Sequence, residues 1–358
     1  MSERVLLTGA TGFLGMEVLV RLLSAPDTEV VLLVRAADRA AAYERLETVL
    51  GTLFDCQPEL LDRVIAVPGD VAAPGLGLSF SDRAGITATC TAVVHCAASI
   101  AFDLPLDEAL EINCAGTRRL LDLAEDMPGL ARFVHVSTAY VSGRTAGAFG
   151  ERDLDRGQRF RNTYEQSKFA AELLVAERAD RLPLVVARPS IVVGDRFSGW
   201  TPAFNVIYWP LRAFARGLLK RVPVDPAGIA DIVPVDYVAD ALVSLLAQRE
   251  VGGRVNLVAG AQAVTNAELI RLACECFDRE PPELCLTAQL PAVGEAQTYL
   301  PYFDVSTRFD DRRARRCLAS RGVATSPLAE FFPTIVRYAE RAGWGKRRLT
   351  RESAGVLA

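Results

Sequence analysis

The sequence predicts an α/β protein with a doubly wound parallel sheet, and two observations carry this prediction. Short β-branched apolar runs alternate with longer stretches of helical periodicity through the first half of the chain. The first of these runs leads directly into a glycine-rich turn that opens a helix. Strands and helices in regular alternation imply right-handed crossovers, which place ligands at the carboxyl ends of the strands. We therefore expect a Rossmann domain.

Six apolar runs are short enough and apolar enough to be buried parallel strands. They are Val5 to Leu7, Val30 to Val34, Val64 to Val67, Ala92 to His95, Phe133 to Val136 and Leu184 to Ala187. Helical periodicity separates them, most clearly at Gly15 to Leu23, Asn113 to Ala124 and Tyr164 to Glu177. These elements predict a Rossmann domain at residues 1–194.

From about Gly194 onward, segments rich in proline and glycine interrupt the alternation. Helices are expected near Thr265 to Phe277 and Leu328 to Ala342, whereas Val255 to Val258 is predicted to return to the sheet. We therefore predict a smaller, mostly helical substrate lobe at residues 195–358, within which residues 229–260 rejoin the Rossmann core.

Composition excludes several classes of protein. A chain of 358 residues, half of them apolar, can bury one large core or two coupled cores. Its net charge of −4 argues against nucleic acid as a partner, which would require an electropositive surface. The eight cysteines show no C-x-x-C spacing, so we predict buried free thiols and no metal site.

The amino terminus lacks the pattern of a signal peptide, because Arg4 to Leu7 runs straight into the glycine loop. We expect the chain to begin at Met1 and to be cytoplasmic. No apolar stretch reaches the ~18 residues that a spanning helix needs, so no transmembrane segment is predicted.

The glycine loop is typical of a site for a dinucleotide pyrophosphate. Gly9 permits a tight turn, Gly12 allows main-chain amides to approach the pyrophosphate, and Gly15 allows the helix to pack closely on the strand. The loop follows a predicted strand and opens a helix, which is the context the motif requires. Its predicted cofactor-binding residues are Thr8, Gly9, Thr11, Gly12, Phe13, Leu14 and Gly15.

The second strand indicates which dinucleotide binds. An NAD enzyme is expected to place an acidic residue at its end, about 20 residues past the glycines, but this chain has Arg35, with Arg45 nearby. Arginine suits a 2′-phosphate, so we predict NADPH; Asp38 complicates this assignment. Asp70, followed by Val71 after the third strand, is a candidate for adenine binding, although an acidic turn residue is nearly as good an interpretation.

Catalytic residues are predicted at Thr138, Tyr164 and Lys168. A tyrosine can act on a substrate oxygen if a positive group favours its anion, and Lys168 lies one helical turn away at i+4. The chain has only three lysines among its 40 basic residues, so a lysine at this position indicates a specific role. Ser137 and Thr138 supply hydroxyls at the carboxyl end of the fifth strand.

Several motifs together resemble the extended short-chain dehydrogenase/reductase superfamily. They are Thr8 to Gly15, Asp70, His95 to Ala98, Asn113, Gly116-Thr117, Val136 to Tyr140, Tyr164 with Lys168, and Arg188 to Ser190. Phe133 to Val141, Asn162 to Tyr164, and Arg188 to Val192 followed by Gly199-Trp200 are especially similar to fatty acyl-CoA reductases and thioester reductase domains. The resemblance implies catalysis by Thr138, Tyr164 and Lys168, and a cofactor site that includes Arg35, Cys96, Ala97, Ala98, Lys168 and Pro189.

The implied activity is NADPH-dependent reduction of an acyl thioester to an aldehyde, with further reduction to an alcohol left open. The acyl group would arrive as acyl-CoA or on a separate carrier protein. The alternative is a dehydrogenase or epimerase acting on a hydroxyl of a sugar nucleotide, steroid or similar alcohol, which would use the same catalytic residues. A nonenzymatic dinucleotide-binding protein has no need to keep the three residues together.

One segment of the predicted substrate lobe is a candidate for acyl-group recognition. Phe204 to Arg221 is expected to be an amphipathic helix with Trp209, Leu211, Phe214, Leu218 and Leu219 on one face and Arg212, Arg216 and Lys220 on another. Such a helix would form an apolar lid with a basic rim, or alternatively a solvated surface helix.

Overall fold

The computed structural model of the chain describes residues 3–55, 58–285 and 300–356, so the predictions on Met1 and Cys56 lie outside the described residues. Within these residues, seven parallel strands form the central sheet, in the order β12-β7-β5-β4-β1-β2-β3. The strands are β1 (Glu3–Thr8), β2 (Thr28–Val34), β3 (Val64–Pro68), β4 (Ala92–His95), β5 (Arg132–Val136), β7 (Leu184–Pro189) and β12 (Gly253–Leu257). The six predicted strands are therefore confirmed, and most of the returning stretch near Val255 forms β12 beside β7.

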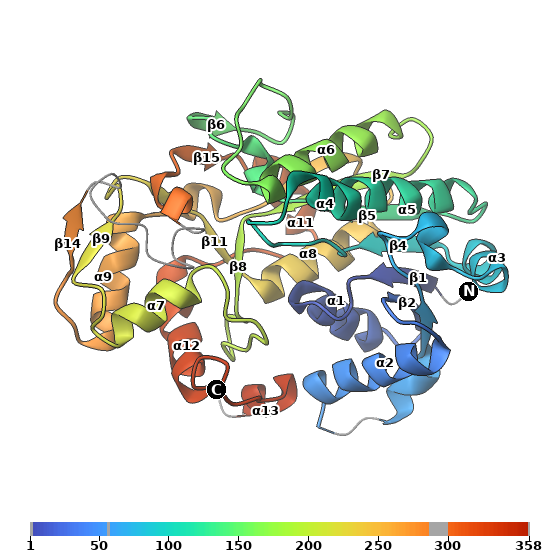
Figure 1. Cartoon of the computed structure of the whole chain (residues 1–358), viewed down its shortest axis with the longest axis horizontal. Helices are drawn as coiled ribbons and strands as arrows, with labels where there is room; N and C mark the ends of the chain where they lie inside the picture. Colours follow the sequence, from blue (N-terminus) through green and yellow to red (C-terminus); the bar gives the residue numbers. More distant parts are fainter. Residues whose placement is uncertain (1–2, 56–57, 286–299, 357–358) are drawn as a thin grey trace.

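Helices cover both faces of this sheet (Figure 1). One face is packed by α1 (Phe13–Ser24), α2 (Arg39–Leu53), α8 (Val235–Ala247) and α11 (Arg312–Ala319). The other is packed by α3 (Phe80–Thr89), α5 (Gly116–Glu125) and α6 (Thr163–Glu177), with α4 (Leu106–Leu110) and a π-helical turn (Glu111–Ala115) leading into α5. This is the doubly wound arrangement predicted from the sequence. The strand order reverses at β1, where β2 lies on one side and β4 on the other, and ligands of such sheets bind beside this point.

A second core lies beside the sheet and is built mainly from α7 (Tyr208–Ala215), α9 (Asn266–Phe277) and α12 (Leu328–Arg341). Paired short strands link it to the Rossmann domain and to the loops beside the sheet. These pairs are β8 (Ile191–Val193) with β11 (Ile232–Pro234), β10 (Ile229–Ala230) with β13 (Val264–Thr265), β9 (Arg221–Pro223) with β14 (Glu283–Cys285), and β6 (Gly147–Phe149) with β15 (Thr307–Phe309). The last helix, α13 (Arg351–Val356), returns to α2. The C-terminal part of the chain thus contacts both cores, and the division at residue 194 stays a prediction.

The helix predicted from Phe204 to Arg221 is shorter than expected. It ends after Ala215, because Gly217 adopts a left-handed conformation (φ +69°) and Leu218 N donates to Ala213 O at 3.0 Å, as in a Schellman cap. Leu211 and Phe214 are buried, but the side chains of Trp209 and Leu218 are 36% and 68% exposed. The expected single apolar face is therefore wrong. Lys220 lies beyond the helix, so the basic residues do not form one helical row either.

Two further observations concern the whole described chain. None of its helices combines the length and the apolar character needed to cross a bilayer. The seven described cysteines are free thiols; Cys90 is buried, and the others are partly exposed rather than buried as predicted.

Candidate active site

The glycine loop joins β1 to α1 in a conformation that only glycine allows. Gly9 has φ +77°, and a Cβ there would lie 2.6 Å from Ala97 N; a Cβ on Gly15 would lie 2.1 Å from Gly9 O. Gly12 is the N-cap of α1 and supplies no capping side chain, so the first amides of α1 have no side-chain acceptor from this position. Thr11 and Gly12 are exposed, whereas Phe13 and Leu14 are half-buried. The loop thus presents an open helix N-terminus that fits a dinucleotide pyrophosphate.

Thr8 holds the ends of β1 and β4 together. Its buried hydroxyl is hydrogen-bonded to His95 Nδ1 at 2.8 Å and accepts from Ala97 N at 3.2 Å. Cys96 N donates to Thr8 O at 3.2 Å. Cys96, Ala97 and Ala98 are consequently placed beside the glycine loop, where each is half-buried.

The predicted residues for the adenosine end lie at the ends of β2 and β3. Arg35 is exposed directly after β2, and Arg45 of α2 donates to its main-chain oxygen. Asp38, the complicating neighbour, is the N-cap of α2 and accepts from Ala41 N at 2.9 Å. The Asp38 carboxylate therefore caps helix α2.

Asp70 and Val71 follow β3 in a turn. One Asp70 carboxylate oxygen accepts from Ala72 N at 2.9 Å, which is the turn interaction left open as the alternative. Val71 packs against Gly116, where a Cβ would lie 3.2 Å from the valine side chain. Asp70 is only half-buried, so this turn lies beside the sheet edge with part of its carboxylate accessible.

The three predicted catalytic residues come from β5 and α6. Thr138 follows β5, and its hydroxyl contacts Pro189 O, the last residue of β7, at 3.4 Å. Helix α6 begins at an Asn162 cap that accepts from Glu165 N at 2.9 Å, and its periodicity places Tyr164 and Lys168 on the same side. The side chains of Thr138 and Tyr164 are hydrogen-bonded to each other. The structure therefore brings the predicted hydroxyls together at the carboxyl ends of β5 and β7.

Lys168 lies behind these hydroxyls. Its Nζ donates to Val136 O at 2.7 Å, and the side chain is buried. Burial lowers the pKa of Lys168 to about 8, although Glu172 and Cys96 oppose this shift. The nearby imidazoles are neutral, because burial and the Lys168 charge lower the pKa of His95 to about 3 and that of His135 well below its ordinary value.

The phenol of Tyr164 differs from the expectation drawn from the sequence. Burial raises its pKa to about 12, the hydrogen bond from Thr138 lowers it, and Glu165 raises it further. The Lys168 ammonium donates to the Val136 carbonyl. Tyr164 is thus a neutral phenol at physiological pH, which is the form needed for a proton donor.

Asn113 connects the two sides of this site, and from the sequence it was known only as part of the family resemblance. In the π-helical turn before α5, Asn113 Oδ1 accepts from Ser99 N at 2.8 Å and Nδ2 donates to Ser99 O at 3.0 Å. The same Nδ2 donates to Ser167 Oγ at 2.9 Å. The segment after β4 is therefore tied to the catalytic helix one residue before Lys168.

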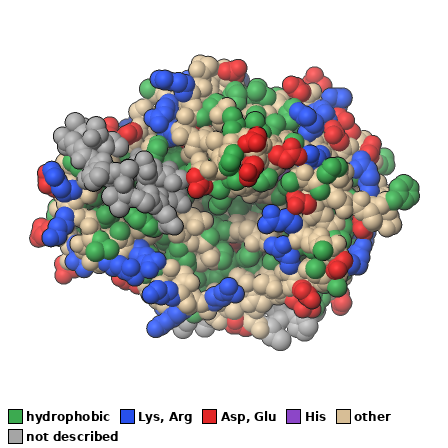
Figure 2. All heavy atoms as spheres, viewed as in Figure 1, with side chains coloured by type: hydrophobic (Ala, Val, Ile, Leu, Met, Phe, Trp, Pro, Cys, Tyr) green, Lys and Arg blue, Asp and Glu red, His purple; other side chains and the backbone are tan. Residues whose placement is uncertain are grey.

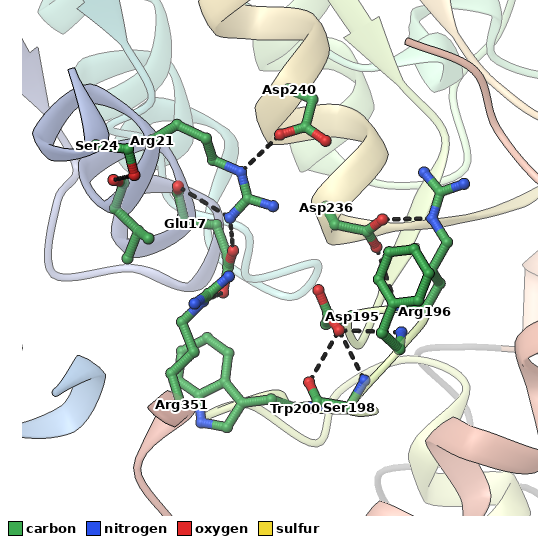
Figure 3. A network of polar contacts seen from close by, with 12 residues as sticks. Glu17, Arg21, Ser24, Asp195, Arg196, Ser198, Trp200, Asp236, Asp240 and Arg351 are labelled. Atoms are coloured by element: carbon green, nitrogen blue, oxygen red, sulfur yellow. Dashed lines mark hydrogen bonds and ion pairs between the residues drawn. The ribbon is translucent and has the colours of Figure 1, made fainter. Parts of the chain in front are cut away.

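Helix α8 contacts both α1 and the loop after β8 (Figure 3). Asp240 accepts from Arg21 of α1 at 2.8 Å, while Asp236 accepts from the main chain of Arg196 at 2.9 Å and pairs with its guanidinium. The buried carboxylate of Glu17 pairs with Arg21 and with Arg351 of α13. The middle and the last turn of α1 are thereby held against α8 and α13.

An apolar pocket opens in the second core. Aliphatic and aromatic side chains of α7, α9 and the short strands line it, among them Leu211, Phe214, Leu269, Ile270 and Ile232. Asn266 is a polar lining residue, but its Nδ2 donates to the main-chain oxygens of Asp225 and Phe303 at 2.9 and 2.7 Å. Figure 2 shows a hollow in the middle of the molecule, with apolar side chains inside and charged side chains of both signs around it.

The sequence did not indicate which residues join this pocket to the catalytic residues. Ile191 and Tyr302 line the pocket and also belong to the apolar cluster around Tyr140, which follows Thr138. Pro301-Tyr302-Phe303 is a short aromatic segment in the sequence, yet nothing local indicates that it contacts residues 140 to 165.

Residues 7–242 match the protein family described as Male sterility protein. The chain belongs to this family. It is 33% identical over 281 residues to human "Fatty acyl-CoA reductase 1", an alignment that covers 66% of this chain and 53% of the human protein. This chain therefore spans about half the length of the curated relatives it matches. The resemblance to extended short-chain dehydrogenase/reductases of the fatty acyl-CoA reductase type is confirmed.

Solved structures agree with this identification. The terminal R domain from the myxalamid PKS-NRPS pathway aligns with a TM-score of 0.82 and 25% identity, covering 97% of this chain and 92% of that domain. UDP-glucuronic acid 4-epimerase from Bacillus cereus aligns with a TM-score of 0.70 but only 18% identity, covering 94% of this chain and 99% of that chain. The second similarity shows the fold alone, so it does not favour the epimerase alternative.

Proposed function

We propose that this protein is an NADPH-dependent reductase of acyl thioesters, which delivers an aldehyde and leaves open a second reduction to the alcohol. The observation that carries this proposal is the apolar pocket of the second core, which shares Ile191 and Tyr302 with the cluster around Tyr140, two residues after Thr138. Its aliphatic and aromatic lining suits an acyl chain, whereas a sugar nucleotide would require several polar partners. The relatives named as fatty acyl-CoA reductases support the same substrate class.

Three residues of the chain have distinct roles in the proposed reaction. A nicotinamide cofactor held by the glycine loop would supply a hydride to the carbonyl carbon of the thioester. The hydroxyls of Tyr164 and Thr138 stabilise the oxyanion that develops, and neutral Tyr164 donates its proton to it. The hemithioacetal then expels its thiol. Lys168, buried beneath these hydroxyls, keeps a positive charge in the site below pH 8 or so.

The acyl thioester would be an acyl-CoA or an acyl group on a separate carrier protein. We would test the activity by following NADPH oxidation with a panel of acyl-CoA and acyl-carrier thioesters while trapping the aldehyde or alcohol for mass spectrometry. Consumption of NADPH with a trapped product is expected. Tight NADPH binding without thioester turnover, together with oxidation of an added secondary alcohol, would instead identify the dehydrogenase alternative.

Replacing Arg35 by alanine is expected to raise the KM for NADPH by about tenfold, the effect of losing one charge-assisted hydrogen bond, and to leave the KM for NADH nearly unchanged. Arg35 is the exposed arginine at the end of β2, and Asp38 beside it is engaged as a helix cap. Arg39→Ala is the matched control, because Arg39 already pairs with Asp82. An equal loss of both cofactors in Arg35→Ala would contradict the assignment to NADPH.

The pH profile should report the ionisation of Lys168. Its pKa lies near 8, below the ordinary 10.5, so the ammonium is present at lower pH and is lost as pH rises through this value. We expect kcat/KM, which reports the free enzyme, to fall above about pH 8. In Lys168→Arg the activity would be lower, but the descending limb should move to higher pH because arginine stays charged. An unmoved limb would assign the ionisation to another group.

A further inference from the structure

Tyr302 connects the apolar pocket to the catalytic helix. It lies in a 3-10 turn (Leu300–Asp304), lines the pocket, and is 9% exposed. Its ring stacks on Phe102 with centroids 5.2 Å apart and meets Tyr140 edge-on at 5.1 Å. Phe102 in turn lies 5.7 Å from the ring of Tyr164. One aromatic ring therefore separates this wall of the pocket from the catalytic phenol.

The hydroxyl of Tyr302 is held as firmly as its ring. It accepts from Asn162 Nδ2 at 3.0 Å and is hydrogen-bonded to the buried carboxylate of Glu165. Asn162 is the N-cap of α6, and Glu165 lies in its first turn. Arg161 lies over the Tyr302 ring at 5.9 Å from the centroid. The side chain is thus fixed to the start of the helix that carries Tyr164 and Lys168.

The main chain around Tyr302 is also anchored to the substrate lobe. Phe303 O accepts from Asn266 Nδ2 of α9 at 2.7 Å, and Ile229 N donates to Val305 O at 2.7 Å. Hydrogen bonds to two separate elements restrict movement of the turn. The ring is consequently a fixed part of the wall rather than a side chain that swings aside.

We propose that Tyr302 is a specificity-determining residue that limits bulk on the carbons next to the thioester carbonyl, an inference that rests on the proposed function. Ile191 and Tyr302 are pocket residues that also pack in the cluster around the catalytic turn. On this proposal the acyl chain extends from Tyr164 into the pocket and passes Ile191 and Tyr302 with its first carbons. Later carbons lie among the aliphatic side chains of α7 and α9. Unbranched chains fit past the Tyr302 ring, whereas a substituent on the carbon next to the carbonyl clashes with it.

The test compares decanoyl-CoA with 2-methyldecanoyl-CoA. In Tyr302→Ala the ratio of kcat/KM for the branched over the unbranched substrate is expected to rise by about tenfold, the usual range for one methyl group in a pocket. Tyr302→Phe should leave the ratio near that of the wild type, because the ring remains. Ile270→Ala, which enlarges the pocket at α9, should alter chain-length preference but not this ratio. Tyr302→Leu serves if the alanine variant does not fold.

An unchanged ratio in a folded Tyr302→Ala or Tyr302→Leu variant would overturn the inference. The same variants are also examined by calorimetric titration with decanoic acid and 2-methyldecanoic acid, which requires no turnover. If wild-type protein reduces neither thioester, the proposed function fails, and the binding ratio still decides the role of Tyr302. A shift towards the branched acid supports that role, and an unchanged binding ratio refutes it.

Discussion

Replacing Tyr164 by phenylalanine is expected to lower kcat for thioester reduction by about 10²- to 10⁴-fold, the usual contribution of a general acid, while the Kd for NADPH stays nearly unchanged. The substitution removes the hydroxyl that is hydrogen-bonded to Thr138. It keeps the aromatic ring that lies 5.7 Å from Phe102, so local packing is preserved. Single-turnover kinetics would measure the chemical step, and fluorescence titration would measure cofactor binding.

Tyr140→Phe is a matched control for this prediction. Tyr140 is buried two residues after Thr138, and it packs edge-on against Tyr302 and Phe309 at 5.1 and 5.6 Å. Loss of its hydroxyl should reduce kcat far less than loss of the Tyr164 hydroxyl. If Tyr164→Phe kept near wild-type turnover, or if both variants lost it equally, Tyr164 would not be the proton donor.

Local pattern was sufficient to predict the sheet and the glycine loop. Parallel strands covered on both faces appear as continuous apolar runs, and Val30 to Val34 or Ala92 to His95 show this directly. The glycines at positions 9 and 15 are required by contacts within the same short segment and with the neighbouring strand end. Tyr164 and Lys168 are one helical turn apart, so their shared side of α6 also follows from the sequence.

Contacts between distant segments could not be predicted in the same way. Phe102, Tyr140 and Tyr302 form one aromatic cluster, although long stretches of chain separate them. The end of α7 was misjudged because apolar periodicity continues through Leu218, while the left-handed conformation of Gly217 stops the helix. The i+4 spacing of Tyr164 and Lys168 also does not reveal that the Lys168 ammonium donates to the Val136 carbonyl.

Replacing Glu172 by alanine is expected to lower the free energy of unfolding by about 3–5 kcal/mol, because it leaves a buried charge without its partner. Glu172 of α6 and Arg188 of β7 are both fully buried and form a bidentate ion pair. Arg188 Nε lies 2.8 Å from Glu172 Oε1, and Arg188 Nη2 lies 2.7 Å from Glu172 Oε2. Arg254 of β12 also pairs with Glu172 at 3.2 Å. Urea denaturation would measure the loss.

Two further variants separate this effect from a general sensitivity of α6. Glu177→Ala, at an exposed position on the same helix, should change the free energy of unfolding by no more than about 0.5 kcal/mol. Adding Arg188→Met to Glu172→Ala should restore part of the stability, because the unpaired cation is removed. If Glu172→Ala lowered the free energy of unfolding as little as Glu177→Ala does, the Glu172–Arg188 ion pair would not stabilise α6. Since α6 carries Tyr164 and Lys168 and β7 ends at Pro189, a large effect would mean that this buried pair holds α6 against the strand that ends beside Thr138.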